Sequence, residues 1–233
     1  MSNEKNKIPI LKLVLAFVYI LCFPALLLFL SGNWLWVEGL VFSAWFIALC
    51  ATAISWLYVK APELLNERFK QPGSKGQKKW DVFVVILLVI GFTAWIVLMP
   101  LDAERFGWTP FFPLWMKIAG GLLLVPSAIL FLRSYMDNPY LSGLVRIQEE
   151  RNQRVITTGV YGVVRHPMYL GAACLFLGAP ILMGSLLGLG LGACLIVLLA
   201  GRSVGEEKML TDELEGYDEY KKKVKYRLIP FIW

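Results

Sequence analysis

The stretch VFVVILLVIGFTAWIVLMP, residues 82–100, carries no charged side chain and is close to the roughly 20 residues that an α-helix needs to cross a bilayer. Similar apolar stretches occupy residues 10–30, 35–58 and 112–132. A longer one, residues 168–200, contains the turn-forming pair Gly184-Ser185, which predicts two short helices at 168–183 and 186–200. The sequence therefore predicts an all-α, polytopic membrane bundle of about six helices, the last two forming a short hairpin.

The composition also indicates a membrane protein. Of the 233 residues, 58% are hydrophobic and 17% are charged, with a mean hydropathy of +0.61, which is more apolar than a water-exposed surface allows. The net charge is +6, but the Lys and Arg residues are grouped between the apolar stretches, so we expect no nucleic-acid partner. The four cysteines stand singly in apolar stretches, where we interpret them as packing residues. With His166 as the only histidine in the sequence, we expect no metal site.

The basic residues predict an orientation through the positive-inside rule. With few exceptions they fall in segments that six helices would place on one side, namely residues 1–12, 60–80, 133–167 and 201–233. Both termini are therefore predicted to be cytoplasmic, in the plasma (inner) membrane if the chain is prokaryotic. Lys5, Lys7 and Lys12 precede the first apolar stretch, but its length and the lack of a small-residue cleavage site predict a retained helix. No repeat or linker divides the chain, which predicts a single domain, residues 1–233.

Charged residues near the ends of the early helices have a structural interpretation. Glu38 and Lys117 are expected to reach the membrane surface or the bundle interior, and Asp102 and Glu104 are assigned to a short outer loop.

The polar sequences flanking the final hairpin carry the candidate chemistry. GVYGVVRHPMY, residues 159–169, precedes it, and Pro167 suits the first turn of the following helix. RSVGEE, residues 202–207, follows it and continues the second helix out of the bilayer. Since the two helices are antiparallel, both sequences are expected at the same membrane face. Arg202 and Glu206, four residues apart, form either an ordinary ion pair or part of a half-lipidic pocket.

The C-terminal stretch has apolar residues at helical spacing with lysines between them, at Leu210, Leu214, Tyr217, Tyr220 and Val224. This pattern is typical of an amphipathic element on the cytosolic membrane surface. A lid over the pocket is the alternative interpretation.

These motifs resemble a known family. The ordered series RHPMY, hairpin, RxxxEExxL and YxxYKKKV, within residues 134–233, is similar to the isoprenylcysteine carboxyl methyltransferase family and the related phospholipid N-methyltransferases. The first four helices match only in general character. The resemblance implies S-adenosyl-L-methionine as the methyl donor, held between the last hairpin and the preceding cytoplasmic segment. Residues 134–233 would then be the cofactor-binding and catalytic part.

The resemblance also implies roles for individual residues. Arg202 would face the substrate and could hold a carboxylate by a two-pronged contact. Glu206 would favour the cationic groups of the donor. With Glu206, the residues implied in cofactor binding are Gln153, Arg154, Val155, Ile156, Tyr161, His166, Pro167, Met168 and Tyr169.

The expected activity is methyl transfer to a lipophilic small molecule or lipid-modified substrate among membrane lipids, with a carboxylate as acceptor. Such a transfer from an activated donor needs no general base. The alternatives are a phospholipid N-methyltransferase, an NADPH-dependent reductase of the sterol-reductase type, and a non-catalytic membrane binding protein or small transporter. The oligomeric state is left open.

Overall fold

A computed structural model describes residues 9–233, and this part of the chain is helical without a strand. Five helices are long and apolar enough to cross a membrane, and α6 is shorter, with 17 residues. The predicted all-α membrane bundle is confirmed. The bundle consists of these five helices and α6: α1 (Ile10–Ser31), α2 (Val37–Lys60), α4 (Lys79–Pro100), α5 (Leu114–Asp137), α6 (Pro167–Met183) and α7 (Leu186–Glu213). The short elements are α3 (Pro62–Arg68), a π-helical turn (Leu101–Arg105), two 3-10 turns (Glu149–Arg151 and Gly159–Gly162) and α8 (Tyr217–Lys223).

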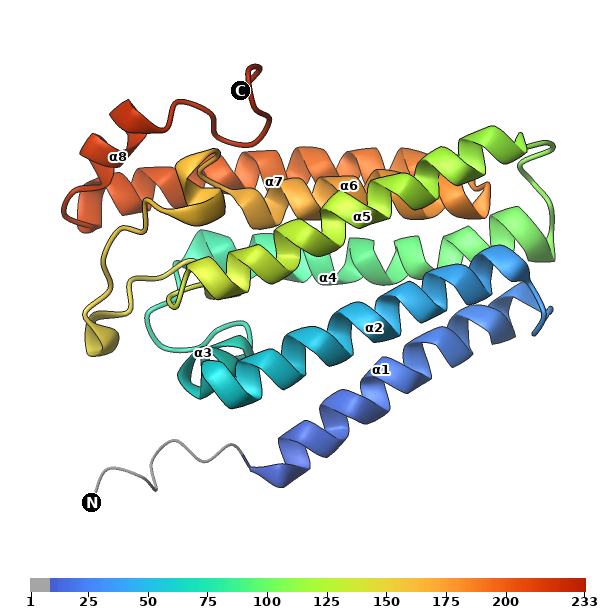
Figure 1. Cartoon of the computed structure of the whole chain (residues 1–233), viewed down its shortest axis with the longest axis horizontal. Coiled ribbons are helices and arrows are strands. Elements are labelled where there is room, and N and C mark those ends of the chain that lie inside the picture. The colour runs from blue at the N-terminus through green and yellow to red at the C-terminus, as the bar shows by residue number, and fades with distance from the viewer. Residues whose placement is uncertain (1–8) are drawn as a thin grey trace.

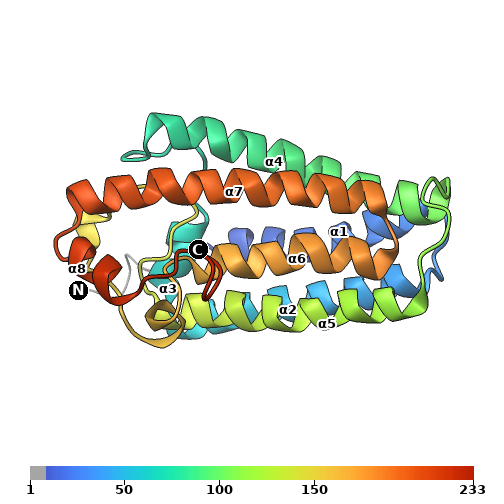
Figure 2. The same cartoon turned by 90° about the horizontal axis from the view of Figure 1, so that it is seen from above.

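The long helices run side by side along the long axis of the molecule (Figure 1). Helix α6 packs against α5 and α7, α7 packs against α4, and α1 contacts both α2 and α4. Seen from above, α4 and α7 lie on one side of the bundle, α2 and α5 on the other, with α6 between them (Figure 2). The C-terminal hairpin is thus built into the bundle through two different neighbours.

The hairpin turn is where the sequence predicts it, but its second helix is longer. Gly184 adopts φ +81°, and the Ser185 hydroxyl caps α7 by accepting from the Gly188 amide at 2.8 Å. The predicted continuation of this helix through residues 202–207 is confirmed, and α7 extends further, to Glu213. Its apolar part ends near Ala200, and the stretch that follows includes the good helix formers Arg202, Glu206, Glu207 and Lys208. This extension carries residues 202–207 beyond the apolar layer.

Apolar side chains fill the interior and also cover the outside of the bundle, as a lipid environment requires. Trp95 is fully buried and Val197 is 72% exposed. Helices α5 and α6 approach closely at small residues, since a side chain at Gly120 would collide with the α6 backbone. The cysteines are free, and the packing interpretation is wrong for Cys22 and Cys194, which are exposed on the outer surface.

One end of the bundle contains a buried carboxylate, Asp102. Its placement in an outer loop is wrong, because it lies fully buried in the π-helical turn that continues α4. Its oxygens accept from the Ser185 hydroxyl at 2.6 Å, the Leu187 amide at 3.1 Å and the Thr109 hydroxyl. Asp102 thus joins the end of α4 to the beginning of α7.

Other charged residues at this end are also paired. Lys117 pairs with Glu38 at 2.6 Å, and the Asn33 side chain donates to Glu104 at 2.8 Å. These contacts agree with a structural interpretation of all three charged residues.

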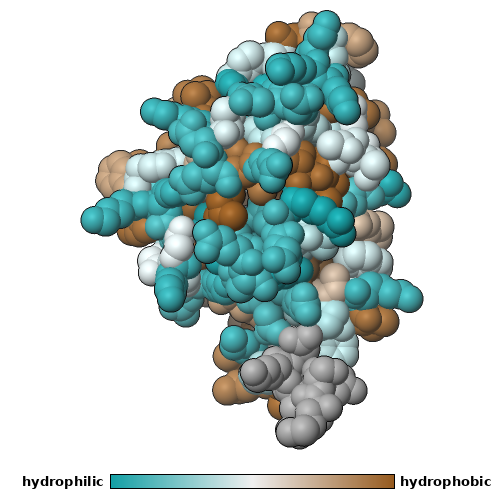
Figure 3. Space-filling model, turned by 90° about the vertical axis from the view of Figure 1, so that its left-hand side faces the viewer, coloured by the Kyte–Doolittle hydropathy of each residue, from teal (hydrophilic) through white to brown (hydrophobic). Residues whose placement is uncertain are grey.

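The opposite end is polar. Helices α3 and α8 and the segment between α5 and α6 gather there (Figure 1), and hydrophilic side chains cover much of this end in the space-filling view (Figure 3). The segments predicted to be cytoplasmic therefore share one end, although which side of the membrane they face remains a prediction. Lys5 and Lys7 lie outside the described residues.

Candidate functional site

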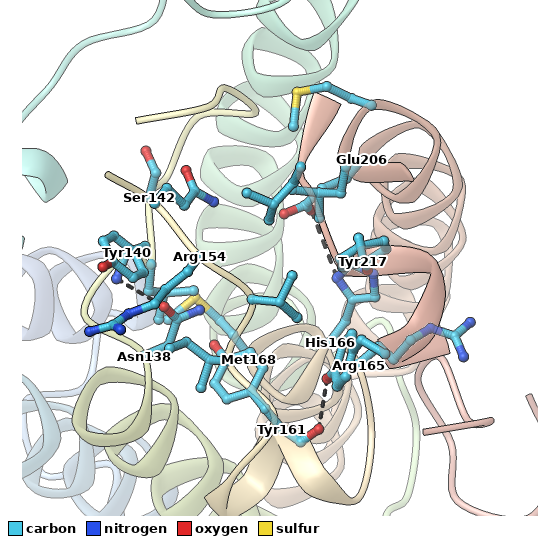
Figure 4. A pocket seen from close by; sticks show the side chains of 18 of the residues that line it. Asn138, Tyr140, Ser142, Arg154, Tyr161, Arg165, His166, Met168, Glu206 and Tyr217 are labelled. Atoms are coloured by element: carbon cyan, nitrogen blue, oxygen red, sulfur yellow. Dashed lines mark hydrogen bonds and ion pairs between the residues drawn. The ribbon is translucent and has the colours of Figure 1, made fainter. Parts of the chain in front are cut away.

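A pocket opens at the polar end, between the α5–α6 segment, the beginning of α6, the end of α7 and α8 (Figure 4). The space between the lining atoms is about 760 Å³ when the open solvent at the mouth is included. The structure brings all ten residues predicted to bind the cofactor to its wall. These are Gln153, Arg154, Val155, Ile156, Tyr161, His166, Pro167, Met168, Tyr169 and Glu206.

A tight turn places Tyr161 in this wall. Gly159 adopts φ +61°, and a side chain there would collide with the Asp137 carboxylate, which accepts from the Val160 amide at 2.9 Å. The turn is thereby fixed to the end of α5. The Tyr161 hydroxyl is buried and makes no hydrogen bond of good geometry within residues 9–233, although the Asn138 and Ser134 side chains lie beside it. Burial raises the pKa of Tyr161 more than these two neighbours lower it, so the hydroxyl stays protonated.

Glu206 supplies a carboxylate to the pocket. Its side chain is 26% exposed, and one oxygen accepts from the Tyr169 hydroxyl at 2.6 Å. No Lys or Arg among the described residues forms an ion pair with it, and His166 Nδ1 lies 3.8 Å away. The negative charge is therefore free to interact with a cationic group in the pocket.

The neighbouring carboxylate, Glu207, is directed away from the pocket. It is 6% exposed and accepts from Arg165 Nε at 2.7 Å, Arg227 Nη2 at 2.9 Å and His166 Nε2 at 3.2 Å. Because a carboxylate only accepts, Nε2 of His166 must carry a proton, which fixes the orientation of the ring. Sequence reasoning did not assign this role to Glu207, since adjacent glutamates on a helix look alike.

Arg202 is not in the pocket wall. Its Nε donates to Asp81 Oδ1 at 2.8 Å and its Nη2 to Asp81 Oδ2 at 3.3 Å and to the Gly143 carbonyl at 2.8 Å. Its Nη1 donates to the Tyr169 hydroxyl at 2.9 Å, so four of the five guanidinium N–H groups have partners. The two-pronged contact with a substrate carboxylate is not possible in this arrangement, because one N–H remains.

The expected ion pair between Arg202 and Glu206 is also absent from the described contacts, and Tyr169 joins the two side chains instead. Sequence reasoning missed the partner, Asp81. It is fully buried at the beginning of α4 and also accepts from the Val145 amide at 2.8 Å. The sequence does show a lone carboxylate at the start of an apolar helix. It does not show that the partner of this carboxylate lies in α7.

Most arginines around the pocket are already paired. Arg146 binds Glu67 through two contacts of 2.9 and 2.8 Å, and Arg165 is held by Glu207. Arg151 lies 3.5 Å from Glu63. Among the pocket-lining arginines, Arg154 has no partner within the described residues.

Helix α8 covers the pocket. Tyr217, Tyr220 and Val224 are buried and pack against Val155 and other apolar residues of the pocket wall. The Tyr220 hydroxyl donates to the Tyr161 carbonyl at 2.7 Å. The apolar face of this element is thus turned inward, which favours the lid interpretation over a helix lying with that face in the membrane. We call residues 217–228 the lid.

Comparisons with known proteins agree with this architecture. Residues 115–215 match the family model described as phospholipid methyltransferase. This match runs from the beginning of α5 to the end of α7 and includes the segment that lines the pocket, so the resemblance to membrane methyltransferases is concentrated in the part of the chain that carries the site. Its fold is similar to that of a eukaryotic intramembrane Ras methyltransferase, isoprenylcysteine carboxyl methyltransferase, with a TM-score of 0.53 and 19% identity over 97% of this chain and 88% of that one.

Curated relatives carry two kinds of name. A protein-S-isoprenylcysteine O-methyltransferase B of Arabidopsis thaliana is 28% identical over 105 residues, 45% of this chain and 50% of the relative. A delta(14)-sterol reductase of Mus musculus is 25% identical over 230 residues, 81% of this chain and 55% of the relative. A delta(14)-sterol reductase of Schizosaccharomyces pombe is 33% identical over 108 residues, which cover 43% of this chain and 24% of the relative. This chain spans about half the length, or less, of these relatives.

Proposed function

We propose that this protein is an S-adenosyl-L-methionine-dependent methyltransferase that acts on a lipophilic substrate in the membrane, with a carboxylate as the acceptor. The observation that carries the proposal is the pocket, where the Glu206 carboxylate, which has no Lys or Arg partner among the described residues, lies in a wall that combines polar and apolar side chains. The lid and the pocket lie in the C-terminal part, residues 134–233, which supports the assignment of cofactor binding to that part.

The residues of the pocket fit such a donor. Glu206 would favour the amino group or the sulfonium, which are cationic, and Arg154 would favour the carboxylate. Val155, Ile156 and the lid tyrosines offer apolar and aromatic surface for the adenine ring. When bound, the donor supplies an already activated methyl group.

Positioning and desolvation would be the main contributions of the protein. The hydrogen bond from Tyr169 fixes the Glu206 carboxylate, and the Glu207 cluster fixes His166 beside it. The lid excludes water, which strengthens electrostatic interactions inside. A carboxylate acceptor is already a nucleophile, so that no proton has to be removed and correct placement of the two reactants can supply much of the rate.

The substrate side would lie toward the membrane. Arg202 precedes Glu206 by about one helical turn in α7 and therefore lies closer to the apolar layer. Its remaining Nη1–H group would contact the acceptor beside the Tyr169 hydroxyl. The substrate, a lipophilic small molecule or a lipid-modified molecule, would then enter from the bilayer while the donor enters from the polar end.

The sterol-reductase relatives make an NADPH-dependent reductase the second candidate. A 2′-phosphate needs free basic side chains, and Arg146, Arg151 and Arg165 are each held by a carboxylate, which leaves Arg154. Glu206 in the same pocket would repel the phosphates. The structure therefore favours the methyl donor.

Calorimetry on the detergent-solubilised protein tests the choice of cofactor. We expect binding of S-adenosyl-L-homocysteine and no binding of NADPH, and the opposite result would favour the reductase. Methyl transfer from labelled donor to lipophilic carboxylates and to amino-lipids then tests the acceptor. Activity restricted to amino-lipids would favour the phospholipid N-methyltransferase alternative.

A further inference from the structure

The last residues of the chain form an apolar hook, residues 229–233, beside the lid. The Leu228 and Ile229 amides both donate to the Trp233 carbonyl, at 2.9 and 3.0 Å, which folds the segment back on itself. Phe231 is 86% and Ile232 78% exposed. This is a concentration of uncovered apolar surface outside the bundle helices.

Backbone contacts place the hook at the rim of the apolar layer. The Arg165 amide donates to the Tyr226 carbonyl at 3.0 Å and the His166 amide to the Arg227 carbonyl at 2.9 Å. Residues 165 and 166 directly precede α6, so the hook lies where α6 begins, and the C-terminus is drawn beside α7 in Figure 1. Exposed apolar side chains at this level can enter the acyl boundary of a bilayer.

A cationic groove lies next to the hook, on the outer side of α7. Its basic side chains are Lys208, Lys221 and Arg227, and its acidic ones are Glu207 and Asp212. Glu207 carries one negative charge and pairs with two arginines, Arg165 and Arg227, which leaves one positive charge in excess. Lys221 pairs with Asp218 at 2.8 Å, and Lys208 has no ion pair within residues 9–233. Positive charge therefore prevails in the groove. Lys225, in the same C-terminal segment, is exposed and also lacks an ionic partner among the described side chains.

The outer surface of α7 below this groove is apolar. Val204 belongs to the groove wall and is 47% exposed, and Val197 lies two helical turns deeper. A basic groove directly above an apolar helix surface matches a molecule with an anionic head and acyl chains. A soluble anion would match the groove but not the apolar surface. A neutral lipid would match the apolar surface but not the groove.

We propose that this groove and the apolar hook bind an anionic phospholipid, and that this binding holds the lid closed over the pocket. Arg227 provides the physical connection, because its side chain lines the groove and its carbonyl ties the lid to His166. A lipid that holds residues 225–233 at the membrane also restricts the lid that precedes them. The proposal concerns lid closure and does not depend on which cofactor the pocket takes.

The test is hydrogen exchange of the lid amides in the full chain, reconstituted without cofactor in nanodiscs of phosphatidylcholine or of phosphatidylcholine with phosphatidylglycerol. We expect slower exchange of residues 217–228 in the anionic nanodiscs. Each lysine near an anionic surface strengthens membrane binding by about five-fold. The double variant Lys208→Gln with Lys225→Gln should therefore reduce the lipid-dependent protection about five- to 25-fold. Phe231→Ser with Ile232→Ser should reduce it as well.

Matched controls separate this site from general effects of charge and apolarity. Lys75→Gln removes an exposed lysine at the same end, and Phe111→Ser removes an exposed aromatic residue from the α4–α5 connection at the other end. Both controls should keep the protection. Equal lid exchange of the wild type in the two nanodiscs would overturn the proposal. Loss of the lid protection in either control variant would also overturn the proposal. The same holds if soluble glycerol phosphate protects the lid amides in neutral nanodiscs.

Discussion

Two adjacent glutamates with opposite roles permit a matched test of the site. Glu206→Gln and Glu207→Gln remove the same charge from neighbouring positions of α7, but the first carboxylate faces the pocket and the second is enclosed by three cationic or hydrogen-bonding side chains. The two variants should therefore fail in different measurements.

For Glu206→Gln, the loss should appear in donor binding. A charge-assisted hydrogen bond contributes about 1.5–3 kcal/mol, so the Kd for S-adenosyl-L-homocysteine should rise about 10- to 150-fold. Thermal stability should change little, because the glutamine oxygen can still accept from the Tyr169 hydroxyl.

For Glu207→Gln, the loss should appear in stability. Removing one partner of a buried ion pair costs about 3–5 kcal/mol, which lowers Tm by about 6–20 °C in a chain of this length. Differential scanning fluorimetry in detergent and calorimetry with S-adenosyl-L-homocysteine provide the two measurements. A normal Kd in Glu206→Gln would refute the role of that carboxylate, and an unchanged Tm in Glu207→Gln would refute the assignment of Glu207 as a structural centre.

Further predictions concern other parts of the chain. Arg202→Ala should lower turnover several-fold more than donor affinity in labelled methyl transfer, and Asp81→Asn should lower Tm by leaving a buried guanidinium uncompensated. Burial raises the pKa of Glu67, but hydrogen bonds mainly from Arg146 outweigh it and lower the pKa to about 2 from 4.5. The stabilisation is complete above pH 4.5 and is lost as pH falls toward 2, so the Tm difference between wild type and Glu67→Gln should shrink over that interval. Gly159→Ala should lower Tm by at least several degrees, because of its positive φ and the collision with a carboxylate. A reporter that functions only in the cytoplasm should be active when it is fused after Trp233, and a reporter that functions only on the opposite side of the membrane should be inactive.

The bundle could be predicted from the sequence because its signal is local. Each apolar stretch is long enough to span a bilayer by itself, and Gly184-Ser185 marks a turn in any context. The sequence predicted that α7 continues through residues 202–207, but its end at Glu213 could not be read from the apolar pattern, which stops at residue 200.

The pocket-lining residues could be predicted because motifs that resemble a family were matched by position. The partners within the site could not, since Arg202 meets Asp81 across 121 residues of chain. An arginine four residues before a glutamate predicts a local ion pair. In the structure the guanidinium pairs with Asp81 instead, because a fully buried carboxylate without a cationic partner would be strongly destabilising. The direction of the lid was left open because an amphipathic pattern does not say which surface its apolar face covers.

Two buried carboxylates, Asp81 in α4 and Asp102 in the π-helical turn that continues it, fix the position of α4 along α7. Asp81 contacts Arg202 near one end of α7, and Asp102 contacts Ser185 and the Leu187 amide at the other. Each residue added to or removed from α4 between these carboxylates would rotate one contact by about 100° and shift it by about 1.5 Å relative to the other. The two contacts can then no longer form together. The number of residues in this part of α4 is therefore fixed by chemistry at its ends, while the apolar side chains between them remain exchangeable.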